Sequence, residues 1–316
     1  MNETSNRKML LNWLLEEENP PIRYRTLTEL LNSPENDREV ETTKKTIPTY
    51  APLAALLAAQ KPAGYWGKPD YYLPKKYSTF SVLTVLADLG LTNENDQVRR
   101  GCEYLFSHQR EDGQFCRRRL IAGQGKIWEA HAATCTHARI VRFLIQFGYG
   151  EDPRARQAIH WLLATQRPDA LWLCSRDPRG HGCLRATLDF LRMAVLDPPT
   201  ATHPTTERAA KVICGLLMQP GMGHYHVNEA WTRLVYPYFN YGVIPALDAL
   251  GRLGFLIEHP KIRAAIDYLS SRRLPDGSWP LDEGLPLPPL IFGAPGKPNK
   301  WLTLDALRVF QLFGLA

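Results

Sequence analysis

Four cysteines occupy comparable places in two consecutive stretches of this sequence. Cys116 and Cys174 each follow an aromatic residue in a turn, whereas Cys135 and Cys183 each lie near the start of the next apolar segment. Thiolate and imidazole groups are suitable zinc ligands, and His181 is two residues from Cys183. Although the spacing matches no recognised zinc motif, these five residues are expected to approach one rim of a cavity and to form a zinc site. The alternative is that the cysteines are small core residues.

Aromatic side chains gather where several apolar helices are expected to begin. Their π faces would shield an apolar chain and stabilise a developing positive charge in a cavity. The alternative is that they only fill the core between helices. The residues expected to line a cavity are Tyr77, Trp128, His137, Tyr236, Tyr238, Asn240 and Trp301.

Basic residues suggest a small anionic ligand. Lys75 and Lys76 precede a helix start, where free backbone amides favour anions, and Arg117 follows the next turn. A diphosphate would fit such a site, although solvated side chains are the simpler interpretation. The formal net charge is +6 and the pI is near 9.0, but the basic groups are scattered and no nucleic-acid-binding motif accompanies them. Nucleic acid is therefore not an expected partner.

These residues are positioned by a repeat of about fifty residues. In five turns a Gln or Arg is followed six positions later by an aromatic residue. The turns run over residues 60–66, 109–115, 166–172, 219–225 and 273–279. The Gln and the aromatic residue are expected to brace adjacent repeats.

Between the turns, apolar residues fall at helical spacing and the segments form pairs. Highly apolar segments ending at glycine predict inner helices, and amphipathic segments beginning at Asp-Pro or His-Pro predict outer ones. Inner helices are expected near 22–32, 78–89, 133–147, 181–194, 239–253 and 300–313, and outer helices near 51–60, 96–108, 153–166, 204–218 and 260–272. A helix over 5–17 would supply the sixth outer partner and close the ring. The prediction is an all-α single domain, residues 1–316, folded as an (α/α)6 toroid, a double ring of six helical hairpins.

With these turns, the sequence resembles the terpenoid cyclase and protein prenyltransferase superfamily of α/α toroids. The turns at 109–115 and 273–279 resemble its QxxDGxW motif most, together with the helix start at 152–154 and the run Lys300-Trp301-Leu302-Thr303-Leu304. The resemblance extends over nearly the whole chain and looks closest to short bacterial squalene-cyclase-like proteins. It implies an isoprenoid or other lipid-like ligand in a central cavity, with cyclase or prenyltransferase chemistry.

The sequence departs from both family activities. It contains no D-x-D-D run, the source of the acid that protonates an alkene in these cyclases, and the starts of the fifth and last inner helices lack prenyltransferase zinc ligands. A non-catalytic lipid carrier or interaction scaffold is therefore the alternative. Carbohydrate chemistry would need paired carboxylates, for which Asp282 and Glu283 are the nearest candidates. Acidic residues of the inner helices are expected to be ordinary surface groups or to form interhelical pairs: Asp88, Asp189, Asp248 and Asp305.

The loop over residues 284–296 contains no charged side chain and is rich in proline. Proline prevents a regular helix, so the loop is interpreted as a lid or plug, with a shallow membrane contact or a protein contact as alternatives. The N-terminal region has neither a secretory signal nor a membrane span. A cytoplasmic location with reduced cysteines is expected, with a membrane-peripheral location as the alternative.

Overall fold

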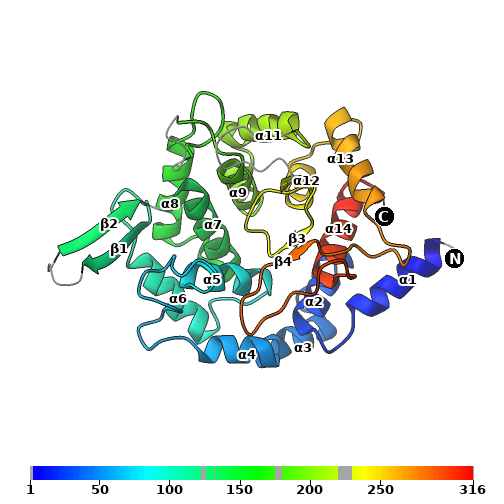
Figure 1. Ribbon diagram of the computed structural model, residues 1–316, viewed down its shortest axis with the longest axis horizontal. Helices are drawn as coiled ribbons and strands as arrows, with labels where there is room; N and C mark the ends of the chain where they lie inside the picture. The colour runs from blue at the N-terminus through cyan, green and yellow to red at the C-terminus, as the bar shows by residue number, and fades with distance from the viewer. Residues whose placement is uncertain (1–2, 122–125, 132, 175–179, 220–229, 316) are drawn as a thin grey trace. The chain divides into compact units, whose positions relative to one another are not determined.

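In the computed structural model, helices dominate the chain (Figure 1). The structure describes residues 3–121, 126–131, 133–174, 180–219 and 230–315, with only the backbone of 3–6, 118–121 and 126–131. The α-helices are α1 (Glu3–Leu14), α2 (Pro20–Arg25), α3 (Arg38–Thr46), α4 (Ala51–Ala58), α5 (Thr79–Asp88), α6 (Asp96–Phe106), α7 (Thr134–Leu144), α8 (Pro153–Ala164), α9 (Leu184–Ala194), α10 (Pro198–Ala201), α11 (Pro204–Leu216), α12 (Val243–Arg252), α13 (Pro260–Ser271) and α14 (Lys300–Leu312). Short helical turns are η1 (Thr26–Leu30), η2 (Ile47–Thr49) and η3 (Ile145–Tyr149).

The strands are short and form two small sheets. Antiparallel β1 (Cys116–Ile121) and β2 (Lys126–His131) form a hairpin, whereas β3 (Val235–Tyr236) and β4 (Glu283–Gly284) pair in parallel. The chain forms two compact units. Unit 1 comprises residues 1–55, 214–220 and 227–316, and unit 2 comprises residues 56–213 and 221–226. The single-domain interpretation stays a prediction.

In unit 2, three apolar helices pack in series. α5 contacts α7, and α7 contacts α9. The outer helix α6 packs on α5, and α8 packs on α7. Burial separates the two kinds of helix, because every residue of α5 from Thr79 to Ala87 is buried, whereas α6 buries only one face. This is the predicted pairing of inner and outer helices.

Unit 1 repeats the arrangement and joins the two ends of the chain. α12 contacts α14, α14 contacts α2 and η1, and α13 packs on α12. The N-terminal helix α1 contacts α14, where the Lys300 ammonium lies 5.5 Å from the ring centroid of Trp13. The first and last helices are therefore neighbours, as the sequence predicted.

The predicted helix limits are confirmed by their local signals. Asp152 caps α8 by accepting a hydrogen bond from the Arg154 amide at 2.8 Å, and α11 and α13 begin at the predicted prolines. Gly90 ends its helix with a φ of +85°, the left-handed geometry expected of a glycine C-cap. Among the described residues, no helix is long and apolar enough to cross a membrane.

Helix α3 and the β1–β2 hairpin were not predicted from the sequence. α3 contains only two buried residues, Val40 and Thr43, which is too few for a clear apolar period. The hairpin follows the second aromatic turn, inside a stretch expected to be a connection.

Candidate functional site

The repeated turns act as braces between consecutive repeats of unit 2. Gln109 donates from Nε2 to the carbonyl of Gly113 in its own turn (3.0 Å) and to that of Arg154 in the first turn of α8 (2.8 Å). Gln60 and Gln166 form equivalent pairs of bonds. This confirms the predicted bracing role of the glutamine, while most of the turn at 219–225 lies outside the described residues.

The aromatic ends of the turns anchor the preceding outer helix. The indole nitrogens of Trp66, Trp172 and Trp279 donate to carbonyls of Leu56, Leu162 and Leu269 at 2.8, 3.0 and 2.8 Å. All three tryptophans are buried. The aromatic residues are therefore structural, as expected.

His137 on α7 was expected to line a cavity. Instead it supports the turn over residues 109–115. It is completely buried, Nδ1 lies 3.4 Å from the Phe115 amide, and Nε2 lies 3.1 Å from the Ala158 carbonyl. Burial lowers the pKa of His137 to about 4, despite the bond to the Ala158 carbonyl. The imidazole is thus neutral and its two nitrogens are engaged by the backbone.

In unit 1, three predicted cavity residues meet in an aromatic cluster. The rings of Tyr236 and Trp301 stack with centroids 5.0 Å apart and 14° between their planes. Tyr238 lies edge-on to Tyr236 at 5.4 Å. Phe292 from the loop 284–296 lies edge-on to Tyr236 at 5.2 Å and to Trp301 at 5.9 Å. We call these four residues the unit 1 aromatic cluster.

The loop 284–296 is anchored by apolar side chains. Leu287, Leu290 and Phe292 are buried, whereas Ile291 is 81% exposed. Phe292 thus fills the unit 1 aromatic cluster from one side, a geometry that fits the predicted plug. Asp282 and Glu283, at its start, form ion pairs with Arg272 and Arg233.

A charge-balanced network lies beside this cluster. Asp305 accepts hydrogen bonds from Arg25 (2.6 Å) and from the hydroxyl of Tyr238 (2.9 Å). Arg308 contacts Asp305 at 3.3 Å and Asp248 at 2.7 Å. Arg252 pairs with Asp248, and Glu29 with Arg25. Three arginines and three acidic residues therefore face one another in unit 1.

Unit 2 contains a second network on its inner helices. Asp189 on α9 accepts bonds from Nη2 of Arg139 on α7, at 2.8 Å from each carboxylate oxygen. Arg185 and Arg192 each lie 3.9 Å from the same carboxylate. Asp88 on α5 pairs with Arg142 on α7. The predicted interhelical pairing of the inner-helix aspartates is thus confirmed in both units.

Aromatic side chains adjoin the unit 2 network. Phe80 on α5 contacts Tyr72 and Phe143 with centroid distances of 5.4 and 6.4 Å. The Arg139 guanidinium lies 6.0 Å from the Phe80 centroid. Tyr72 is half-buried, while Phe80 and Phe143 are buried. Cationic and apolar groups thus lie next to each other within unit 2.

The predicted anion-binding residues are placed differently. Lys75 and Lys76 are exposed, and Arg117 forms a bidentate ion pair with the buried Asp70, at 3.1 and 2.6 Å. The hydrogen bonds to Asp70 raise the pKa of Arg117. No described contact of Arg117 involves either lysine. Among the other cavity candidates, Tyr77 is half-buried, Asn240 is exposed, and the side chain of Trp128 lies outside the described residues.

The five predicted zinc ligands do not form a metal-binding arrangement in the described part of the chain. No group of three or more histidine, cysteine or acidic residues there is placed to hold a metal ion. Burial raises the pKa of Cys183 to about 12, with added contributions from nearby Cys135 and Cys174, and its sulfur accepts the Ala186 amide at 3.4 Å. Cys116 is buried and His181 is exposed. The zinc site therefore stays a prediction.

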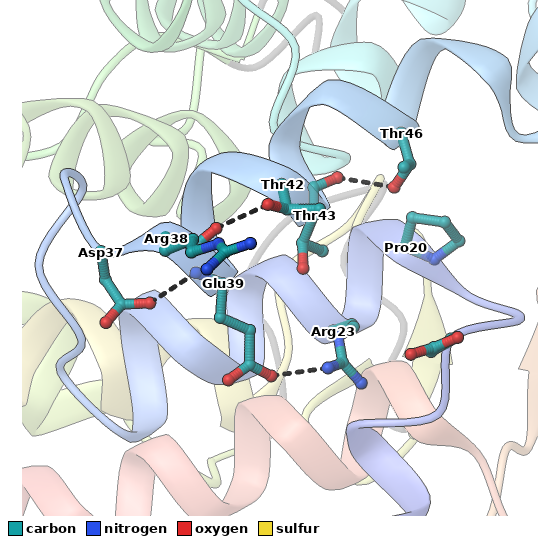
Figure 2. Close-up of a pocket in the computed structure, with 9 residues that line it drawn as sticks. Pro20, Arg23, Asp37, Arg38, Glu39, Thr42, Thr43 and Thr46 are labelled. Carbon is teal, nitrogen blue, oxygen red and sulfur yellow. Dashed lines mark hydrogen bonds and ion pairs between the residues drawn. The ribbon is translucent and has the colours of Figure 1, made fainter.

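A surface groove was not foreseen from the sequence. It has a volume of about 670 Å³ and is lined by residues of α2, α3 and the segments before them (Figure 2). Arg23 donates to Glu39 at 2.6 Å across it, and Asp37 caps α3. Arg23, Glu39 and Asp37 are thus already used for local structure.

The arginine partners of the inner-helix aspartates were missed altogether. The sequence predicts only apolar helices for the segments that contain Arg25, Arg139, Arg185 and Arg192. The available signal was a charged residue inside a helix apolar on several faces, because such a charge needs a partner when buried.

Comparison with known proteins identifies the fold. The model of the squalene-hopene cyclase C-terminal domain family matches residues 28–183. A protein from Actinoplanes of known crystal structure is 18% identical over 98% of this chain and 99% of its own, with a TM-score of 0.51. None of the curated proteins matches the chain. The resemblance to terpenoid cyclases is confirmed, and with it a mostly helical fold of the α/α-toroid class.

Two further structures are more distant. The type II terpene cyclase MstE from Scytonema is 16% identical over 92% of this chain and 87% of its own, with a TM-score of 0.45. A variant of that enzyme in complex with geranylgeranyl dihydroxybenzoate is 15% identical over 96% and 98%, with a TM-score of 0.46.

Proposed function

We propose that this chain, squalene-hopene-cyclase-like over residues 28–183, binds an isoprenoid or similar lipid-like ligand. The match to that family is the observation that supports the proposal most directly. Aromatic faces suited to an apolar chain lie within the matched segment, where Tyr72 is half-buried against Phe80. Such faces exclude water and stabilise positive charge.

A thermal-shift panel tests the proposal. Squalene, farnesol and farnesyl diphosphate are compared with an oligosaccharide, because a ligand that binds the native state raises its unfolding temperature. We expect the isoprenoids to stabilise the protein and Tyr72→Ala to weaken the effect. Tyr50→Ala is the matched control, since Tyr50 is also half-buried but belongs to neither aromatic group. Stabilisation by the oligosaccharide alone would refute the proposal.

The first candidate activity is cyclisation or prenyl transfer with non-standard residues. Cyclase chemistry needs an acid strong enough to protonate an alkene, and the chain has no D-x-D-D run. Asp88, Asp189, Asp248 and Asp305 on the inner helices are each paired with arginine. This pairing favours the second candidate, a non-catalytic carrier or scaffold. Product analysis by mass spectrometry after incubation with bound isoprenoids separates the two.

Zinc remains a prediction from the sequence. If Cys135 and Cys183 were ligands, metal analysis should find one zinc ion per chain and lose it in Cys135→Ser and Cys183→Ser. A wild-type protein without zinc, or stoichiometric metal that survives both substitutions, refutes that ligand set.

A cytoplasmic location with peripheral membrane contact through the loop 284–296 is also proposed, and the exposure of Ile291 supports the contact. Co-sedimentation with neutral lipid vesicles should fall on Ile291→Ser if the loop inserts. Equal sedimentation of both proteins would contradict the contact.

A further inference from the structure

Helices α7 and α9 begin side by side in unit 2. The two helices pack together (Figure 1), and Arg139 of α7 bonds to Asp189 of α9, fifty positions later in the chain. One helical turn earlier, Cys135 and Arg185 are again fifty positions apart. Burial opposes the charge of Arg185, but Cys135 raises its pKa more than any other neighbour does. The two pairs show that the helices run in the same direction and that their first turns face each other.

Two thiols lie where these first turns meet. Cys183 is the N-cap of α9, and its sulfur accepts the Ala186 amide at 3.4 Å. Cys135 is the second residue of α7. After burial, Cys135 is the largest contributor to the raised pKa of Cys183, ahead of Cys174. Cys135 is therefore the thiol that interacts most strongly with Cys183.

The two sulfurs differ in accessibility. Cys135 is half-buried, whereas Cys183 is only 7% exposed. A dissolved oxidant therefore reaches Cys135 first, and Cys183 is the neighbouring thiol that can resolve the product. The packing of α7 on α9 holds the two residues together in the folded chain.

We propose that Cys135 and Cys183 form an oxidisable dithiol that closes to a disulfide between α7 and α9. The oxidant is a small soluble disulfide of the glutathione type. The Cys135 thiolate attacks one sulfur of the oxidant, so that a mixed disulfide forms and one glutathione leaves. Cys183 then attacks the Cys135 sulfur and releases the second glutathione. The proton of each cysteine goes to the departing glutathione, and two protein thiols are oxidised while one oxidised glutathione is reduced.

The disulfide would join the starts of two inner helices across the part of the chain that contains α8. A cross-link of this kind restricts mainly the unfolded chain, and for a protein of this size we expect the unfolding temperature to rise by about 5 °C. No isoprenoid takes part in the step. The dithiol can therefore be confirmed or refuted separately from the proposed function.

Incubation of the folded protein with oxidised glutathione tests the dithiol. After alkylation of the remaining thiols, mass spectrometry should find a peptide pair linked through Cys135 and Cys183, which dithiothreitol separates. Cys135→Ser should form no internal disulfide and show no rise in unfolding temperature. Cys174→Ser is the matched control, because Cys174 is also half-buried and also acts on Cys183, and it should oxidise like the wild type. Circular dichroism verifies that each variant is folded.

Other products would overturn the pairing. A link between Cys174 and Cys183, or mixed disulfides with glutathione alone, refutes it. A Cys135–Cys183 link that lowers the unfolding temperature also refutes it, because the sulfurs would then have to leave their native positions to react. Metal analysis of the untreated protein is the last check, since both thiols are also predicted zinc ligands. One zinc ion per chain that is lost in Cys135→Ser would replace the dithiol by the metal site.

Discussion

Arg139 and Asp189 form an ion pair between α7 and α9 in which the arginine side chain is 0% exposed and the aspartate side chain 4%. Nη2 of Arg139 lies 2.8 Å from both carboxylate oxygens, and Nε lies 3.3 Å from one of them. The residues are 50 positions apart, about one repeat. The pair therefore links consecutive inner helices in their interior, where a lone charge would be costly.

Asp189→Asn should destabilise the protein strongly. The substitution leaves three arginines around a neutral amide, and breaking a buried pair from one side costs about 3–5 kcal/mol. Urea unfolding measures the loss. Glu103→Gln is the control, because its pair with Arg154 is 50% and 40% exposed and should contribute less than about 1 kcal/mol. Equal losses in the two variants would contradict a special role of Asp189.

Gln109→Ala should weaken the junction between two repeats. The variant loses both bonds from Nε2 and leaves the Gly113 and Arg154 carbonyls without this donor, so we expect a loss of about 1–3 kcal/mol. Gln97→Ala is a suitable control, since the backbone carbonyl rather than the side chain of Gln97 accepts the bond from Gln60. Urea midpoints that are the same for both variants would show that the turn does not need its glutamine.

His137 should make stability depend on pH. Its pKa is about 4 in the folded protein and 6.5 in the reference state, so the unfolded chain binds the proton more strongly between these values. Stability therefore falls as pH drops below 6.5, by on the order of 2 kcal/mol between pH 7 and 5. The cause is the complete burial of the imidazole, which disfavours its charged form.

Unfolding of the wild type and His137→Thr over this pH range measures the effect. Threonine is a natural choice, because Thr79 and Thr303 accept the amides of Trp66 and Trp279 in other repeats, each at 3.0 Å. The variant should lose this part of the pH dependence. Parallel pH profiles for the two proteins would disprove the assignment.

Phe292→Ala should loosen the loop 284–296. Phe292 is buried against Tyr236 and Trp301, and removal of a buried phenylalanine costs about 3–5 kcal/mol. Hydrogen exchange within the loop and urea unfolding should both show the change. Neighbouring Ile291 is 81% exposed, so Ile291→Ala should alter neither. Loop exchange unaffected by Phe292→Ala would refute the anchoring role.

The helices and their limits could be predicted because their signals are local. Pro153 opens α8 and Gly90 follows α5, and each residue imposes its backbone preference wherever the helix is packed. The turns could also be predicted, since Gln109 forms a hydrogen bond to Gly113 only four residues away. α3 was not predicted, because a helix with only two buried residues shows little apolar periodicity in its sequence.

The candidate site could not be predicted in the same way. The zinc site stays a prediction, because comparable repeat positions do not fix the distances between the cysteine side chains. Arg117 was expected to bind an anion, but in the structure it forms an ion pair with Asp70, which lies 47 positions earlier in the sequence.

The sequence by itself determined a mostly helical repeat protein, because helix signals and braced turns act over a few residues. Only the tertiary structure decided which charges meet: Arg25 reaches Asp305 across 280 positions, and three arginines converge on Asp189. The physical reason is that burial makes a charge depend on its neighbours in space, and those neighbours come from other repeats.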